Sequence, residues 1–213
     1  MSVFNLEDAR ELMLRKHLRG RGIGDRRVLE AMASVPRERF IGDPFRELAY
    51  ADRALEIACG QTISQPYIVA LMSEALELKG EEKVLEVGTG SGYQTAVLAE
   101  LAGRVVSIER HPQLSVQAGK LLADLGYANV SLVCADGTEG WAEGAPYDRI
   151  IVTAAAVHCP SPLVAQLRDG GILVIPIGGP AGQMLEAIHK TGDRTKVISL
   201  SPCRFVPLIG AQA

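Results

Sequence analysis

Residues 84–93 of this 213-residue chain are Val84-Leu85-Glu86-Val87-Gly88-Thr89-Gly90-Ser91-Gly92-Tyr93. The first four suit a buried strand, the glycines suit a tight turn, and the residues after them suit a helix. A strand, a glycine turn and a helix in this order commonly hold a nucleotide-like ligand at the N-terminus of the helix. We therefore expect a ligand site at residues 88–92.

Strands and helices are predicted to alternate from this segment onwards. Strands are expected at Lys83–Val87, Arg104–Glu109, Val130–Cys134, Arg149–Val152 and Gly171–Pro176, and helices at Tyr93–Leu101, Gln113–Leu125 and Ser161–Leu167. This alternation is typical of the α/β class, with a doubly wound, mostly parallel, Rossmann-like sheet that helices cover on both faces. Met184–Lys190 and Lys196–Leu200, joined by a short polar turn, predict an antiparallel C-terminal hairpin.

The N-terminal part of the chain is predicted to be helical. We expect amphipathic helices at Leu6–Leu18 and Asp25–Ala33, a turn at Arg37–Ile41, and a helix at Tyr67–Leu78 that Pro66 opens. Residues 42–64 lack a clear period and are expected to form a loop with one short extended piece. We interpret residues 1–213 as one domain, in which residues 1–80 form the helical region and residues 81–213 the ligand-binding sheet.

The composition limits the class of protein. The chain has 47% hydrophobic residues and a formal net charge of −3, which favours a soluble domain and argues against a general nucleic-acid binder. Its four cysteines have no paired spacing, so neither a metal site nor a disulfide framework is expected. No apolar stretch has membrane-spanning length. We expect a cytoplasmic monomer, although a basic run between Arg10 and Arg27 leaves an RNA-docking face as an alternative.

An acidic residue lies at or just after the end of each of three successive predicted strands, whose carboxyl ends meet at one edge of a parallel sheet. Glu86 is expected to face the ligand crevice, where an anion suits an amino group and a sulfonium better than a pyrophosphate. Glu109 can accept hydrogen bonds from both hydroxyl groups of a ribose. Asp136 can accept one from an adenine amino group, and Gly137 leaves room for the ring. The three positions together favour S-adenosylmethionine as the ligand.

The glycine pattern alone leaves a dinucleotide site open. Gly88, Gly90 and Gly92 lack side chains, so main-chain N–H groups can approach either kind of ligand closely. The dinucleotide fingerprint places its third glycine one residue later, where this chain has Tyr93. The turn therefore favours S-adenosylmethionine over NAD without excluding NAD.

The chain resembles the protein-L-isoaspartate O-methyltransferases, which move a methyl group from S-adenosylmethionine to a damaged aspartyl carboxylate. The most specific part of the resemblance is the polar segment Gly60-Gln61-Thr62-Ile63-Ser64-Gln65-Pro66, here called the lid. The resemblance extends from Val35-Pro36-Arg37-Glu38-Arg39-Phe40 to Arg204-Phe205-Val206-Pro207-Leu208. It implies S-adenosylmethionine as the cofactor, S-adenosylhomocysteine as the product, and no metal.

The resemblance also implies roles for individual residues. Ser64 would orient the substrate and is the expected catalytic residue, although an isolated Ser before a helix suits an N-cap. The cofactor-binding residues would be Glu86, Gly88, Thr89, Gly90, Gly92, Glu109, Arg110, Asp136 and Gly137, and the substrate-binding residues Thr62, Ile63, Gln65, Val206 and Pro207.

A carboxylate acceptor agrees with the residues that come after the fourth predicted strand. Residues 152–158 supply neither metal ligands or a base for a catechol nor the Pro-Pro-aromatic signature for a base nitrogen. The free α-carboxyl group of an isoaspartyl residue has a pKa of roughly 3.3–3.7, so it needs no base. The expected function is methylation of isoaspartyl residues in damaged proteins, which initiates repair through a succinimide.

Three positions depart from the family pattern. Glu56 and Ala58 stand where the family has proline and glycine, and Ala135 stands where it has glycine before the Asp. We expect these departures to affect the lid and the adenine pocket rather than the type of reaction. The alternative functions are an RNA or small-molecule methyltransferase on the same cofactor scaffold, and a non-catalytic module that binds the cofactor.

Overall fold

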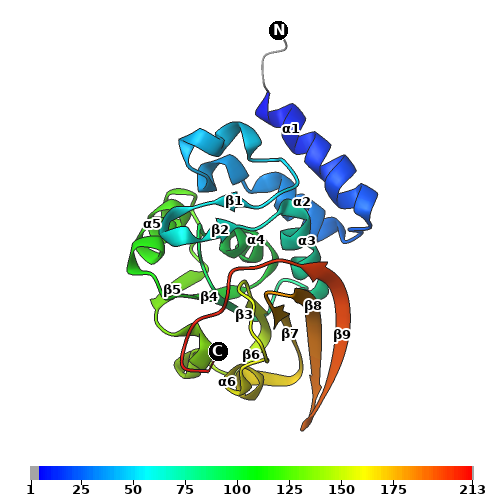
Figure 1. Cartoon of the computed structure of the whole chain (residues 1–213), viewed down its shortest axis with the longest axis vertical. Coiled ribbons are helices and arrows are strands. Elements are labelled where there is room, and N and C mark those ends of the chain that lie inside the picture. Colours follow the sequence, from blue (N-terminus) through cyan, green and yellow to red (C-terminus); the bar gives the residue numbers. More distant parts are fainter. Residues whose placement is uncertain (1–4, 213) are drawn as a thin grey trace.

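A seven-stranded sheet forms the centre of the structure, a computed structural model that describes residues 5–212 (Figure 1). The strand order is β5-β4-β3-β6-β7-β8-β9. Strands β3 to β7 are parallel, and β8 and β9 add an antiparallel hairpin at one edge. The bounds are β3 Lys83–Val87, β4 Arg104–Glu109, β5 Val130–Cys134, β6 Tyr147–Val152, β7 Leu167–Gly179, β8 Gly182–Thr191 and β9 Arg194–Cys203.

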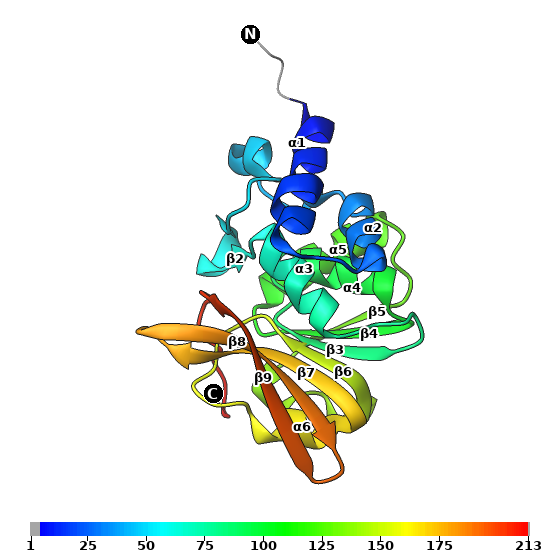
Figure 2. The same cartoon turned by 90° about the vertical axis from the view of Figure 1, so that its right-hand side faces the viewer.

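Helices cover both faces of this sheet (Figure 2). One face carries α2 Arg26–Ser34, α3 Pro66–Ala75, α4 Tyr93–Leu101 and α5 Pro112–Asp124, and the other carries α6 Ser161–Gln166. The predicted fold class is therefore confirmed. The strand order reverses at β3, which lies between β4 and β6, and such a reversal opens a crevice at the carboxyl ends of the strands.

Alternate residues of the central strands pack into two separate cores. On β3, Val84 belongs to the core beneath α2, α3 and α4, whereas Leu85 belongs to the core beside α6. On β4, Val105 and Val106 repeat this division. A strand that is buried on both faces needs apolar residues at nearly every position, which explains the continuous valine and isoleucine runs.

The N-terminal region is helical, but less regular than predicted. Helix α1 covers Leu6–Leu12, after which the chain widens into π-type turns at Met13–Leu18 and tightens into a 3-10 turn at Arg19–Arg21. Gly22 ends this run with a φ of +98°. Further 3-10 turns cover Arg37–Phe40 and Asp43–Leu48. Within residues 5–212, no helix combines the length and the apolar character needed to cross a membrane.

The segment before α3 contains more strand than predicted. Strands β1 Leu55–Glu56 and β2 Thr62–Ile63 pair antiparallel, so the expectation of one short extended piece was wrong. The turn between them requires Cys59 to adopt a φ of +59°, which is uncommon for a residue other than glycine. Pairing between β1 and β2 fixes the direction in which the lid enters α3.

Strand β7 continues beyond Pro176, where the prediction ended it. Pro176 pairs with Leu185 of β8, and its carbonyl oxygen accepts a hydrogen bond from Ala156 N on the opposite side. The missing N–H of the proline therefore falls on the side where β6 has already ended. The hairpin predicted from β8 and β9 is confirmed, and each of its strands is longer than expected.

The division into buried and exposed strand positions predicts how two matched substitutions differ. Ile151 of β6 is 0% exposed and Ile198 of β9 is 38% exposed. Ile151→Ala should lower the free energy of unfolding by about 2–5 kcal/mol, because it leaves a cavity in the core. Ile198→Ala should change it by only about 0.5 kcal/mol. Urea titrations of both variants check this. Equal decreases in the free energy of unfolding would contradict the assignment of Ile151 to the core and of Ile198 to the surface.

Candidate active site

A cavity opens at the carboxyl ends of β3, β4 and β6 and contains about 840 Å³ of empty space, including its open mouth. The lid, the glycine turn after β3 and the C-terminal segment all contribute to its wall. The predicted site residues that line it are Thr62, Ile63, Ser64, Gly88, Thr89, Gly90, Glu109, Arg110, Gly137, Val206 and Pro207. The structure thus brings together residues that are more than a hundred positions apart in the sequence.

The first glycine of the turn has no room for a side chain. Gly88 has a φ of +100°, and a Cβ atom there would lie 2.3 Å from Oγ1 of Thr153. This hydroxyl group donates a hydrogen bond to Gly88 O at 2.7 Å, so the turn is held against the loop after β6. Gly92 does not line the cavity; its φ of +88° allows the chain to enter α4. The turn therefore needs its glycines for geometry as well as for access to a ligand.

Glu109 connects the turn to the end of β4. Its side chain is 5% exposed. Oε2 accepts a hydrogen bond from Gly90 N at 2.8 Å, and Oε1 accepts one from His111 N at 2.9 Å. A carboxylate has about four lone-pair sites, so each oxygen can accept one further hydrogen bond. The arrangement suits two neighbouring ribose hydroxyl groups.

Glu86 differs from the expectation that it faces the crevice. Its side chain is 0% exposed and lies behind the turn, where Oε2 accepts hydrogen bonds from Thr95 at 2.5 Å and Ser107 at 2.6 Å. The Ser107 hydroxyl also lies 2.6 Å from that of Thr89, which lines the cavity. Burial raises the pKa of Glu86 to about 8. Glu86 therefore supports the turn from within the core, through Ser107 and Thr89, and does not form part of the cavity wall.

Asp136 is also withdrawn from the cavity wall. Oδ1 accepts hydrogen bonds from the main chain and the hydroxyl group of Thr138, and Oδ2 accepts one from Ala211 N at 2.8 Å. Burial alone would raise the pKa of Asp136, but these hydrogen bonds hold it below its usual range. Gly137 does line the cavity, and a Cβ atom there would lie 2.4 Å from Cγ1 of Val87. The glycine is therefore required by packing against β3 as well as by the space it leaves for a ring.

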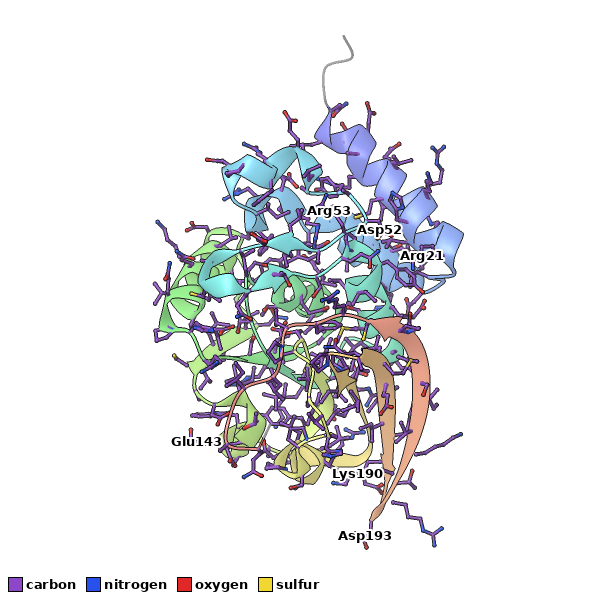
Figure 3. The ribbon with its side chains drawn as sticks, viewed as in Figure 1. Arg21, Asp52, Arg53, Glu143, Lys190 and Asp193 are labelled. Atoms are coloured by element: carbon purple, nitrogen blue, oxygen red, sulfur yellow. The ribbon has the colours of Figure 1, made fainter. Side chains whose placement is uncertain are left out.

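The C-terminal end of the lid is held in place by two hydrogen bonds. Ser64 O accepts a hydrogen bond from Nη2 of Arg37 at 2.8 Å. The side chain of Gln65 points away from the cavity and donates to Asp52 O at 2.9 Å. Asp52 also accepts a hydrogen bond from Arg21 at 2.8 Å, and Figure 3 shows these two residues next to each other in the N-terminal region. Ser64 itself is half-buried and lines the cavity.

The C-terminal segment forms the wall opposite the lid. Ala155 N donates to Val206 O at 2.8 Å, and Leu208 N donates to Ala155 O at 2.7 Å. These main-chain hydrogen bonds place Val206 and Pro207 next to the loop after β6. Figure 1 shows this segment crossing in front of the sheet.

Several residues of the cavity were not predicted from the sequence. They are Gln61, Val69, Val87, Ser91, Tyr93, Gln94, Ile108, His111, Thr153, Ala154, Leu208 and Ile209. Most adjoin predicted residues in the chain. Thr153 and Ala154 could have been found, because they come directly after the strand that lies next to β3 at the reversal of strand order.

The residues of the cavity fit a bound S-adenosylmethionine. The N–H groups of Gly88–Gly90 already donate to Ile108 O and Glu109, so it is the carbonyl groups of this turn that suit the amino group of its amino-acid end. The Glu109 carboxylate suits its ribose. Among residues 5–212, no group of three or more His, Cys, Asp or Glu side chains is placed to hold a metal ion. The fold and the cavity together define an S-adenosylmethionine-dependent methyltransferase of the α/β class.

Comparisons with known proteins identify the family within this class. The family model described as Protein-L-isoaspartate(D-aspartate) O-methyltransferase (PCMT) matches residues 8–213. Protein-L-isoaspartate O-methyltransferase 1 of Syntrophobacter fumaroxidans is 51% identical over 208 residues, which cover 98% of this chain and 97% of that protein. This chain therefore belongs to the protein-L-isoaspartate O-methyltransferase family, as its resemblance predicted.

Solved structures agree with this assignment. A protein-L-isoaspartate O-methyltransferase superposes with a TM-score of 0.85 at 30% identity, covering 95% of this chain and 67% of that chain. A Plasmodium falciparum protein assigned to the same activity, in complex with S-adenosyl-L-homocysteine, superposes with a TM-score of 0.80 at 26% identity, covering 94% and 98%. The predicted cofactor is therefore confirmed.

The buried Glu86 predicts a specific dependence of stability on pH. Its pKa is about 8 in the folded protein against an ordinary 4.5, so the unfolded chain releases the proton first. Stability should therefore fall as the pH rises from about 5 to about 8. Glu86→Gln should remove this contribution, and its melting temperature relative to wild type should rise over that range.

Thermal melts of wild type and variants at pH values between about 5 and 8 measure this effect. The matched control is Glu77→Gln, because Glu77 is exposed and meets solvent in both states. The difference in melting temperature from wild type should change more with pH for Glu86→Gln than for this control. If the difference in melting temperature between Glu86→Gln and wild type changed with pH no more than that of the control, Glu86 would not resist ionisation in the folded protein.

Proposed function

We propose that this chain methylates the free α-carboxylate of L-isoaspartyl residues in damaged proteins, and that the residues of this cavity perform the reaction. One observation carries the assignment of residues. Ser64, in the lid, lines the same cavity as the Gly88–Gly90 turn and the Val206–Pro207 segment. The proposed substrate-orienting hydroxyl group thus lies between a cofactor site and a second wall that an extended peptide can contact.

The cofactor is held mainly by main-chain groups and carboxylates. When bound, S-adenosylmethionine supplies the methyl group from its sulfonium. The turn at Gly88–Gly90 would bind its amino-acid end, and Glu109 would accept hydrogen bonds from its ribose. We assign Arg110, Asp136 and Gly137 to the adenine end of the cofactor. Gly137 lines the cavity there, and Asp136 holds the chain around it through hydrogen bonds from Thr138 and Ala211. Glu86 contributes indirectly, because it accepts a hydrogen bond from Ser107, whose hydroxyl group contacts that of Thr89.

The acceptor requires alignment rather than a base. The α-carboxyl group of an isoaspartyl residue has a pKa of roughly 3.3–3.7, so it is ionised near neutral pH. Ser64 would donate a hydrogen bond to one of its oxygens and leave the other facing the methyl group. Thr62 and Ile63 on one side, and Val206 and Pro207 on the other, would hold the peptide and exclude water.

The product ester makes the next step of repair possible. A carboxylate offers no usable leaving group, whereas a methyl ester can lose methanol. The neighbouring amide nitrogen can therefore attack the ester carbonyl carbon, form the C–N bond of a succinimide and release methanol as the C–O bond breaks. Hydrolysis of the succinimide returns part of the material to the normal aspartyl linkage. We propose that this sequence is the route by which the enzyme repairs aged Asn and Asp residues.

We further propose that the enzyme works as a cytoplasmic monomer without a nucleic-acid partner. The four cysteines are free, which suits a reducing compartment. The basic run near the N-terminus is partly paired within the protein, with Arg10 on Glu38, Arg21 on Asp52 and Arg26 on Glu30.

The test of the function uses peptides that differ only in one linkage. Labelled methyl from S-adenosylmethionine should appear on a peptide that contains L-isoaspartate, and not on the matched L-aspartate peptide. The label should be labile to base, because it is a carboxyl ester. Label on neither peptide, with tight binding of S-adenosylhomocysteine, would contradict the proposed acceptor and favour an RNA or a small molecule instead.

Ser64→Ala tests the role of the lid. Loss of one donor that aligns a charged oxygen should lower the kcat for the isoaspartyl peptide by about 100-fold. The affinity for S-adenosylhomocysteine, measured by calorimetry, should stay unchanged. Ser161→Ala is the control, because Ser161 is an exposed residue at the start of α6 on the far face of the sheet. The N-cap of α3 is Gln65, without a side-chain capping hydrogen bond. If Ser64→Ala weakened cofactor binding and stability instead, Ser64 would have a structural role in the lid.

A further inference from the structure

A fully buried arginine lies directly behind the lid. Arg37 belongs to the Val35–Phe40 segment, which carries the family resemblance but has no part in the reaction described above. Its side chain is 0% exposed. Nε donates a hydrogen bond to Ala49 O at 2.7 Å, and Nη2 donates one to Ser64 O at 2.8 Å. One planar guanidinium group therefore joins the lid to the turn that precedes it.

Arg37 forms no ion pair within residues 5–212, and Asp52 acts on its charge only at longer range. Its Nη1 has no hydrogen-bond partner among these residues. The guanidinium carbon lies 4.6 Å from the centre of the Tyr93 ring, and Tyr93 lines the cavity. Burying an unpaired cation is costly, and an apolar side chain of similar volume would commonly stabilise a core at least as well. Packing alone therefore does not explain an arginine at this position.

We propose that Arg37 is a positioning residue for methyl transfer. The proposal rests on the role assigned to Ser64 under the proposed function. The hydrogen bond from Nη2 fixes the carbonyl group of Ser64, and the bond from Nε fixes the same guanidinium to Ala49. The main chain of Ser64 is thereby held at one distance from the core, and this fixes the point at the cavity wall from which its side chain starts.

Arginine suits this task better than any other side chain. Its donors lie in a rigid plane, so two carbonyl groups from different segments can be held at once. A lysine has three donors on one nitrogen, so it can hold two carbonyl groups only where both reach the same atom, as Lys190 does with Val164 O and Leu167 O. It has no second nitrogen atom with which to hold Ala49 O and Ser64 O separately, as Nε and Nη2 of Arg37 do. A displacement of about 1 Å in an aligning group can lower a rate by about 100-fold.

Arg37→Met and Arg37→Lys test the proposal, with Arg27→Met as the matched control. Arg27 also holds two carbonyl groups, those of Leu78 at 2.8 Å and Leu101 at 3.1 Å, but it contacts no part of the lid. Well below the melting temperatures, both Arg37 variants should lose about 100-fold in kcat for the isoaspartyl peptide. Their affinity for S-adenosylhomocysteine should match wild type, and Arg27→Met should keep wild-type kcat. Full activity in Arg37→Lys would overturn the proposal, and this variant carries the test if Arg37→Met does not fold.

A double-mutant cycle with Ser64→Ala separates positioning from a general effect on the fold. If Arg37 acts through Ser64, Arg37→Met should lower kcat by less than about threefold in a Ser64→Ala background, because the group it positions is already absent. Losses that multiply in full would overturn the inference and leave the role of Ser64 intact. Unchanged transfer by Ser64→Ala alone would overturn the role of Ser64 and the inference with it.

Discussion

The Glu109 carboxylate is the contact on which the rest of the site depends. It accepts hydrogen bonds from Gly90 N and His111 N, so it joins the loop after β3 to the loop after β4. Parallel strands bring these loops to the same edge of the sheet, but the loops need a shared acceptor to adopt one arrangement. An anion that is 5% exposed and bonded to main-chain donors is held firmly enough to present its remaining lone pairs to a ligand.

The parts of the fold that depend on local sequence were predicted well. The bounds of β3, β4, β5 and α4 are the same as those predicted, because each is an apolar run between clear turn signals. The lid and the glycine turn were found because their residues carry unusual local chemistry. The extent of β7 and the pairing of β1 with β2 were not predicted, because they depend on partner strands that no local pattern specifies.

The direction of side chains was the weakest part of the prediction. Glu86 and Asp136 belong to the right strand ends, yet the first lies behind the glycine turn and the second accepts a hydrogen bond from Ala211. Arg37 lies 27 residues before Ser64, and no spacing rule connects the two. Contacts between distant segments decide these cases, whereas a sequence pattern reports only the element to which a residue belongs.

The crossing of Val206–Leu208 over Ala155 has a consequence for the order of folding. A cavity wall that joins residues so far apart along the chain cannot form until the sheet between them has formed, because closing such long loops is unfavourable before the strands pair. A partly folded copy with an intact glycine turn would still lack the wall opposite the lid. Completion of the active site is therefore a late event, and only a finished molecule can act on the damage in others.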